Sequence, residues 1–463
     1  MHRLFLLKTM KHTLTLLIAL LLSPLSVLMA QEALSTMHFK PRDHALGDVH
    51  PFFHEGECFL YYLKPGKYES ALARSRDWLT WTETPITHEV VKPDDWMSPY
   101  FVLGVFHDPA GKVFRSFYGH AQGRMASSVS DDLLRWSCAP KEFHVPAASY
   151  YERRRDPFVF WIPEMKQYGC VMTTQIKGRS KNKAGAISLA TSPDLKQWQD
   201  HGPILDPGNI GEPECPQMFR MGQRWYLLAS IYDRAVGPPV YWVSDQPLGP
   251  WGKEPAGRLD GKDLCAAQIA FDGDTPVLFG WIPLTPAKPG QQPWGGHLAL
   301  PREMHSLADG TLGTRLPGKL IKAFEPLLWR AVPDFTITAE PHTIEGQWQH
   351  LAAEITLLMP IGVNEVRVRF APLGEIILHR TRLRVLDGRG ECWSELPAQL
   401  PADQPITVRL FIEDNIVELF VHDRYSLAAR LPASAGPMRL SLKTDAGKAQ
   451  ASLARASEWH LSR

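Results

Sequence analysis

Short apolar runs separated by turn-forming residues dominate the chain, whereas long helical patterns are few. The runs at residues 58–62 (Cys-Phe-Leu-Tyr-Tyr) and 158–161 (Phe-Val-Phe-Trp) have the length and the aromatic content of buried strands. The 463 residues also include 34 Gly and 39 Pro, which favour turns. These features predict an all-β protein of two domains, each large enough to bury its own core.

A repeated turn motif divides the first part of the chain into units. The pattern Ser-x-Asp-x-x-x-Trp occurs at residues 75–81, 130–136 and 192–198, and a looser copy occupies residues 244–251. Its Trp residues are 55, 62 and 53 positions apart. A unit of roughly 50 to 60 residues with several short strands is typical of a propeller blade. We therefore predict a five-bladed β-propeller, with residues 255–320 as the unmarked blade. The motif is expected to cap a hairpin, which its Trp locks from outside.

The pattern changes in the last third of the chain. Residues 365–370, 406–412 and 417–421 alternate between apolar and polar positions without the Ser-Asp-Trp motif. Alternation with period two, bounded by turns, predicts antiparallel sheets and hence a C-terminal β-sandwich. We expect the propeller domain at 37–325 and the β-sandwich domain at 330–463.

The N-terminus has the pattern of a secretory signal peptide. Its apolar run, residues 14–30, contains 17 residues and is short for a membrane span. We predict a signal peptide at residues 1–30 and export to the periplasm or the extracellular space, with an uncleaved anchor as the alternative. No later segment is long enough to cross a bilayer. The run follows four basic residues: His2, Arg3, Lys8 and Lys11.

Charge and cysteine content exclude several classes of partner. The chain carries 50 Lys+Arg against 49 Asp+Glu, so it lacks the basic excess of nucleic-acid-binding proteins. None of its six Cys forms a Cys-x-x-Cys pair, which argues against a zinc site. The cysteines are expected to be buried free thiols, and we expect neither a metal nor a cofactor. The 15 Trp suit an oligo- or polysaccharide substrate, because a ring face covers the C–H face of a sugar.

Three acidic residues stand at the starts of three predicted blades. Asp48, Asp156 and Glu214 each precede a strand-like run. The first strand of a blade lines the central channel, so the three carboxylates should converge there. Such carboxylates repel one another, and a glycosidase uses this: one stays ionised while the pKa of another rises until it donates a proton. A calcium site is the alternative, but the basic residues 153–155 beside Asp156 argue against it.

The motifs around these acids resemble a known family. Residues 155–157 (Arg-Asp-Pro) and 214–216 (Glu-Cys-Pro) are similar to two signatures of glycoside hydrolase family 32, the invertases, inulinases and levanases. Residues 263–268 and 294–303 resemble later segments of that family in the same order. Residues 410–421 resemble its appended β-sandwich. The resemblance runs from about residue 40 to the C-terminus.

The resemblance implies a retaining hydrolase of β-fructofuranosides such as sucrose, inulin or levan. By this resemblance Asp48 would be the nucleophile, and Glu214 would be the general acid and then the base. Asp156 would hold sugar hydroxyls and stabilise the transition state, with Arg155 orienting it. A retaining mechanism predicts carboxyl groups of Asp48 and Glu214 about 5–5.5 Å apart.

The first motif departs from the family pattern. The family has Asn-Asp-Pro-Asn-Gly, whereas residues 47–51 read Gly-Asp-Val-His-Pro, so both flanking Asn are missing. We expect His50, Trp96 and Trp281 to contact the substrate together with Arg155, although a core role is equally open for Trp96. Three alternatives remain: an arabinofuranosidase-like enzyme, a fructosyl-transferring enzyme, or a carbohydrate-binding propeller without catalysis. The oligomeric state is open.

Overall fold

A computed structural model gives the fold of most of the chain. All described elements belong to one compact unit, Leu34–Arg463. The predicted signal peptide (1–30) and Trp96 lie outside the described residues. Among the residues described, no helix is long and apolar enough to cross a membrane. The structure describes residues 34–35, 37–66, 69–89, 104–120, 124–145, 150–231, 237–285, 293–324, 332–432 and 437–458.

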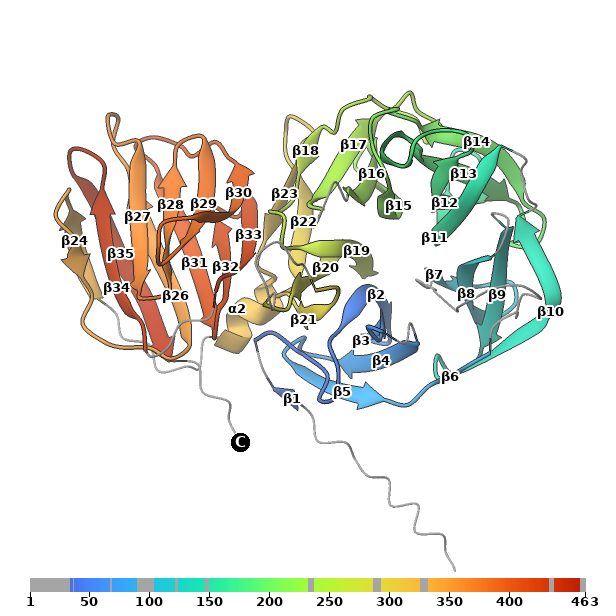
Figure 1. Ribbon diagram of the computed structural model, residues 1–463, viewed down its shortest axis with the longest axis horizontal. Coiled ribbons are helices and arrows are strands. Elements are labelled where there is room, and N and C mark those ends of the chain that lie inside the picture. Colours follow the sequence, from blue (N-terminus) through green and yellow to red (C-terminus); the bar gives the residue numbers. More distant parts are fainter. Residues whose placement is uncertain are drawn as a thin grey trace, which may run out of the picture. The chain divides into compact units, whose positions relative to one another are not determined.

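Strands make up nearly all of the regular secondary structure described, and the first part of the unit contains five sheets (Figure 1). Within each sheet most neighbouring strands are consecutive in the sequence and antiparallel. The strands of the first three sheets are β1 (Leu34–Ser35), β2 (Gly47–His54), β3 (Glu57–Leu63), β4 (Ser70–Ser75) and β5 (Thr80–Thr84); β6 (Thr87–His88), β7 (Gly104–Asp108), β8 (Val113–His120), β9 (Arg124–Ser130) and β10 (Arg135–Val145); and β11 (Tyr151–Ile162), β12 (Gln167–Ile176), β13 (Gly185–Ser192) and β14 (Gln199–Leu205). Those of the next two are β15 (Pro213–Met221), β16 (Arg224–Ile231), β17 (Pro239–Ser244) and β18 (Gly257–Arg258); and β19 (Cys265–Asp272), β20 (Thr275–Pro283), β21 (Gly296–Leu298), β22 (Arg302–Ser306) and β23 (Leu312–Arg315). A short 3-10 helix, η2 (Lys181–Lys183), precedes β13.

The five sheets are arranged around a common centre. Strands β2, β7, β11, β15 and β19 lie nearest to it in Figure 1. These innermost strands contact one another in that order, and β19 closes the circle against β2. Their first residues therefore come close together in space, although more than 200 positions separate Asp48 from Cys265 in the sequence.

The repeated motif forms the turn between the third and fourth strands of a sheet, counted outward from its innermost strand. In the copy at 75–81, Ser75 Oγ donates to Asp77 Oδ1 (3.1 Å), and Asp77 Oδ1 accepts from the backbone of Leu79 (2.9 Å). The copies at 130–136 and 192–198 form the same bonds. The predicted hairpin cap is thus confirmed. The predicted outside position of the Trp is wrong, because all four are 1–9% exposed and pack in the core: Trp81, Trp136, Trp198 and Trp251.

Two six-stranded sheets form the rest of the unit and share one large apolar core. The alternation predicted for this region appears in the burial of its strands; in β26, for example, Leu351, Ala353 and Ile355 face the core. Before these sheets lies helix α2 (Gly318–Phe324). The strands are β24 (Val332–Ile337), β25 (His342–Thr343), β26 (Leu351–Leu358), β27 (Glu365–Ala371), β28 (Gly374–His379), β29 (Arg382–Asp387), β30 (Cys392–Pro397), β31 (Pro405–Glu413), β32 (Ile416–Val421), β33 (Tyr425–Arg430), β34 (Arg439–Thr444) and β35 (Ala449–Glu458).

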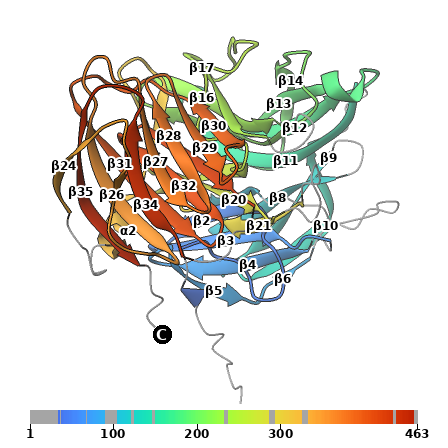
Figure 2. The ribbon, with the colours of Figure 1, turned by 60° about the vertical axis from the view of Figure 1, so that its left-hand side comes forward.

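A buried ionic cluster joins the fifth sheet to the later sheet that contains β31 and β32, and Figure 2 gives a second view of both regions. Arg302 Nη2 donates to Asp260 Oδ2 (3.1 Å) and pairs with Glu418 of β32. His38 lies between Glu418 Oε1 (3.1 Å) and Glu413 Oε2 (2.9 Å). We call these five residues the interface cluster. Because Arg302, Asp260 and Glu418 are all 0% exposed, their charges rely on one another rather than on water.

The six cysteines are free. Four of them are buried, as predicted, whereas Cys138 is half-buried and Cys392 is exposed. The expectation of buried thiols therefore fails for Cys392, which lies on strand β30.

Candidate active site

Four of the five innermost strands carry a β-bulge, which lies near the first residues of β2, β15 and β19 and in the middle of β11. A bulge inserts an extra residue, increases the local twist and turns a side chain in a new direction. Residues with left-handed backbone lie at three of them: Asp156 (φ 53°), Cys215 (φ 51°) and Ala266 (φ 42°). This conformation is unfavourable for residues other than Gly by roughly 1–2 kcal/mol. The four register shifts fall between Gly47 and His50, Arg155 and Phe158, Glu214 and Gln217, and Cys265 and Gln268.

The bulges define which residues are equivalent from sheet to sheet. Asp48 and Asp156 are each the first unpaired residue of their bulge, whereas Glu214 comes one position earlier and still pairs with Ser230. Cys215 occupies the bulge position in β15, and its backbone N–H donates to Asp156 Oδ2 (3.2 Å). Asp48 and Glu214 therefore lie at the second position of their innermost strands, close to the predicted start, whereas Asp156 is the sixth residue of β11, so the prediction that it begins a strand is wrong. Glu214 also does not occupy the same register position as the two aspartates.

Arg155 links the carboxylates at this end of the strands. Its Nη1 donates to Asp156, and its Nη2 donates to Glu214 Oε1 and to Glu212 Oε2, both at 2.5 Å. Asp156 also accepts from Thr173 Oγ1 at 3.1 Å. We call Arg155, Asp48, Asp156, Glu212 and Glu214 the acid cluster.

Asp48 is bound from the other side by an indole. Trp281 Nε1 donates to Asp48 Oδ1 (3.2 Å), and both side chains are buried. Trp281 in turn meets Trp294 edge to face, with ring centroids 6.3 Å apart. A Cβ added at Gly47 would lie 2.8 Å from the ring of Trp294. The space that an Asn would need at position 47 is therefore already filled, which accounts for one departure from the family motif.

Burial and mutual repulsion separate the pKa values of the acids. Burial, and then the charge of Asp156, raises the pKa of Asp48 to about 6. Burial also raises the pKa of Glu214 to about 7; Arg155 opposes this rise, whereas Asp48, Asp156 and Glu212 add to it. Burial would also raise the pKa of Glu212, but the charges of Arg155 and Arg153 outweigh this effect and lower that pKa to about 2. At neutral pH the cluster can thus offer ionised carboxylates beside one that still carries a proton.

His50 lies on the same strand as Asp48 but is turned into the protein. Its side chain is buried, and its Nε2 lies 3.3 Å from Nε2 of Gln268 on β19. Burial lowers the pKa of His50 to about 3, so the ring is neutral and accepts this hydrogen bond. Of the four predicted substrate contacts, Arg155 and Trp281 touch the acids directly, and Trp96 lies outside the described residues.

The sequence interpretation missed Glu212 as a member of the cluster. Glu212 and Glu214 are two positions apart, a spacing that places both side chains on one face of an extended segment. The neighbouring run of Arg153 to Arg155 offered the complementary charge. These two signals together could have identified it. Trp294 had no such signal, because its contact with Gly47 depends on how β2 and β21 meet.

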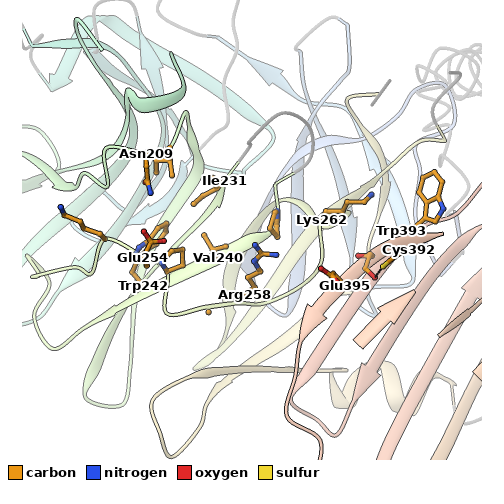
Figure 3. Close-up of a pocket in the computed structure, with 16 residues that line it drawn as sticks. Asn209, Ile231, Val240, Trp242, Glu254, Arg258, Lys262, Cys392, Trp393 and Glu395 are labelled. Atoms are coloured by element: carbon orange, nitrogen blue, oxygen red, sulfur yellow. Dashed lines mark hydrogen bonds between the residues drawn. The ribbon is translucent and has the colours of Figure 1, made fainter. Parts of the chain in front are cut away.

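A second hollow of the described structure lies away from the acid cluster. It has about 860 Å³ and opens between β17 and β18 of the fourth sheet and β30 of the later sheets (Figure 3). Trp242, Arg258, Lys262 and Trp393 line it, and none of the acid cluster does. Within the described ranges, no group of three or more His, Cys, Asp or Glu side chains is arranged to hold a metal ion.

Known proteins with related sequences or folds act on fructosides. The chain is 25% identical over 303 residues to a sucrose-6-phosphate hydrolase of Vibrio alginolyticus (59% of this chain, 58% of that protein). It is 25% identical over 311 residues to a raffinose invertase of Escherichia coli (59% and 61%). These alignments thus span less than two thirds of either relative.

Solved structures share the fold over a longer stretch. An exo-inulinase from Aspergillus awamori superposes with a TM-score of 0.69 at 17% identity, covering 92% of this chain and 98% of that one. A fructan 1-exohydrolase IIa from Cichorium intybus superposes with a TM-score of 0.70 at 14% identity (92% and 97%). The sequence model of the glycosyl hydrolases family 32 N-terminal domain matches residues 38–315. This match covers more than half of the sequence and includes the whole acid cluster, and we conclude that the chain belongs to glycosyl hydrolases family 32.

Proposed function

We propose that this protein is a retaining glycoside hydrolase that acts on β-fructofuranosides of the sucrose, inulin or levan type. One observation carries the proposal: Arg155 binds Asp156 and Glu214 next to a buried Asp48, and burial raises the pKa of Glu214 to about 7, as a general acid requires. Family membership and the activities named for the relatives support the substrate class.

Each acid has a separate role in the proposed mechanism. Asp48, held by the indole of Trp281, attacks the anomeric carbon and forms a covalent glycosyl-enzyme. Glu214, with a pKa of about 7, first protonates the leaving oxygen and then activates water. Asp156, which Arg155 holds in place, binds sugar hydroxyls and stabilises the positive charge of the transition state. Trp281 holds Asp48 in its attacking orientation.

The proposal includes the architecture and the location of the protein. We propose that the five sheets are blades of a β-propeller over residues 37–325 and that the two later sheets form a β-sandwich over 330–463. The cyclic contacts of the innermost strands and the shared core of the later sheets support this assignment. The basic and apolar pattern of residues 1–30 supports export to the periplasm or the extracellular space.

The first sugar subsite differs from the family pattern around Asp48. Trp294 fills the space beside Gly47, and His50 bonds to Gln268 instead of projecting an amide. These contacts leave the acids in place but change the donors available to a furanose. A different furanoside, such as an arabinofuranoside, is therefore the second candidate substrate.

The test is a release assay with purified protein on sucrose, sucrose 6-phosphate, inulin, levan and 4-nitrophenyl arabinofuranoside. We expect release of fructose from at least one fructoside, and its loss in Asp48→Asn and Glu214→Gln. Reactions in methanol-containing buffer should yield the methyl β-fructoside, since double displacement retains the anomeric configuration.

Two matched variants serve as controls. Asp245→Asn and Glu164→Gln remove the same chemical groups from surface positions remote from the acid cluster, and both should retain full activity. Turnover of the arabinofuranoside alone would replace the fructoside assignment by the second candidate. Undiminished turnover in both acid variants would refute the proposed site.

A further inference from the structure

Glu212 shares a single donor nitrogen with Glu214. Arg155 Nη2 donates to Glu212 Oε2 and to Glu214 Oε1, each at 2.5 Å. The other oxygen of Glu212 is held by Arg153 Nη2 and by the side-chain amide of Gln175. With three donors on its carboxylate and a side chain only 13% exposed, Glu212 is held in one place beside the guanidinium.

The donors on Glu212 keep it ionised. Arg155 and Arg153 outweigh the effect of burial and lower the pKa of Glu212 to about 2, so its negative charge is present throughout the neutral range. Among the described residues Glu214 has one charged donor, Arg155, and the nitrogen that it uses also donates to Glu212. A fixed negative charge beside a second carboxyl disfavours ionisation of the latter, and Glu212 adds in this way to the larger effects of Asp48 and Asp156 on Glu214.

We propose that Glu212 is a positioning residue that shares the Arg155 guanidinium with Glu214 and, by its fixed negative charge, keeps Glu214 in the protonated form that a general acid requires. This inference rests on the proposed function, because it gives Glu214 the role of the acid. Glu212 needs no contact with the substrate for this purpose. Its effect reaches the reaction through the proton on Glu214.

A purely structural role predicts a different result. If Glu212 only fixed Arg153 and Arg155, its removal would lower kcat/KM by the same factor at every pH. If it maintains the proton on Glu214, its neutral replacement leaves Arg155 Nη2 to Glu214 alone. The alkaline limb of the pH profile then moves to lower pH, because Glu214 ionises earlier.

The experiment compares pH profiles of kcat/KM on whichever fructoside the wild-type protein cleaves. Glu212→Gln should move the alkaline limb down by about 1 pH unit. Arg153→Gln removes a cation from the same carboxylate and should move the limb up, by less, since Arg153 is 50% exposed and partly screened. Glu152→Gln, an exposed carboxylate on the same strand, should leave the limb unmoved.

A second readout needs no substrate. In protein labelled with ¹³C at the Glu carboxyl groups, the Glu214 signal is assigned by its absence in Glu214→Gln and then titrated. Its midpoint should fall in Glu212→Gln and rise in Arg153→Gln. If the wild-type protein cleaves no substrate, the proposed function fails while this titration still decides the role of Glu212.

The outcomes that overturn the inference are defined for both variants. An unchanged Glu214 midpoint in folded Glu212→Gln, or a loss of activity equal at all pH values, refutes it. Should Glu212→Gln fail to fold, Arg153→Gln decides, because its half-exposed side chain is expected to tolerate replacement. A midpoint that rises in Arg153→Gln supports the inference, and one that stays or falls refutes it.

Discussion

Two clusters in this protein pair a glutamate with an arginine, and the pKa values of the two glutamates shift in opposite directions. Glu418 of the interface cluster is 0% exposed, yet its pKa is lowered: burial raises it, but Arg302 and His38 outweigh that effect. Glu214 of the acid cluster is 22% exposed, yet its pKa is raised to about 7. Burial alone would raise the pKa of Glu418 more than that of Glu214.

The number of partners explains the difference. Glu418 accepts from His38 and from the backbone N–H of Leu300 (2.7 Å), and it pairs with Arg302. Glu214 shares Arg155 with two other carboxylates and is repelled by Asp48 as well. A cluster with enough donors keeps its carboxylates ionised and stabilises the fold. In a cluster with too few donors the carboxylates repel one another, and this repulsion raises the pKa of one of them, as a general acid requires.

The largest effect should come from replacing the proposed acid. Glu214→Gln should lower kcat/KM about 10³-fold, because a general acid contributes roughly that factor. The same change removes a repelled carboxyl, so the melting temperature should stay the same or rise. Thermal unfolding and the release assay on one preparation check both halves. A marked fall in melting temperature would show that Glu214 stabilises the fold as Glu418 does.

The matching replacement in the interface cluster should lower the stability of the protein and leave its activity unchanged. Glu418→Gln leaves the buried Arg302 short of a counter-charge and should destabilise the protein by about 3–5 kcal/mol. The kcat/KM of the protein that remains folded at 25 °C should not change. Urea unfolding measures the first quantity and the release assay the second. Glu354→Gln, which breaks a more exposed pair with Arg409, should change stability by only about 0–1 kcal/mol.

His38 should make the interface cluster sensitive to alkaline pH. Burial lowers the pKa of His38, but its bonds to Glu413 and Glu418 outweigh this and raise it to about 8. A pKa raised on folding contributes stability that is complete below about pH 6.5 and lost as pH rises through 8. His38→Gln should therefore destabilise by about 2 kcal/mol at pH 6 and by much less at pH 9.

Unfolding curves at the two pH values test this expectation. The exposed His54 is the matched control, and His54→Gln should show no such difference between them. An equal destabilisation by His38→Gln at both pH values would mean that the imidazole contributes by packing and not by charge.

Local pattern in the sequence was sufficient for much of the fold. The Ser-Asp motif carries its own hydrogen bonds within five residues, as at Ser75 and Asp77, so it marks the same turn wherever it occurs. Alternating positions such as those of β26 bury one face and predict antiparallel sheets. Both signals depend on neighbours in the sequence and need no knowledge of distant residues.

Features that depend on distant residues were not predictable. The bulge that makes Cys215 rather than Glu214 the equivalent of Asp156 depends on how β15 pairs with β16. The contact of Trp294 with Gly47, and the pairing of His38 with Glu418, join segments far apart in the chain. For the same reason the sequence identified three of the acids but neither Glu212 nor the nitrogens of Arg155 that the carboxylates share.

The smallest expected effect is the dependence of kcat/KM on pH, which is also the most direct test of the acid cluster. The proposed mechanism needs Asp48 ionised and Glu214 protonated, so kcat/KM should fall below about pH 6 and above about pH 7. One pH unit beyond either limb should reduce it about tenfold, or roughly 1.4 kcal/mol. In Glu214→Gln the alkaline limb should disappear while the acid limb near pH 6 remains, because only Asp48 then titrates. An alkaline limb that persists in this variant would assign it to a group other than Glu214, and the contrast between the two clusters would no longer explain the chemistry.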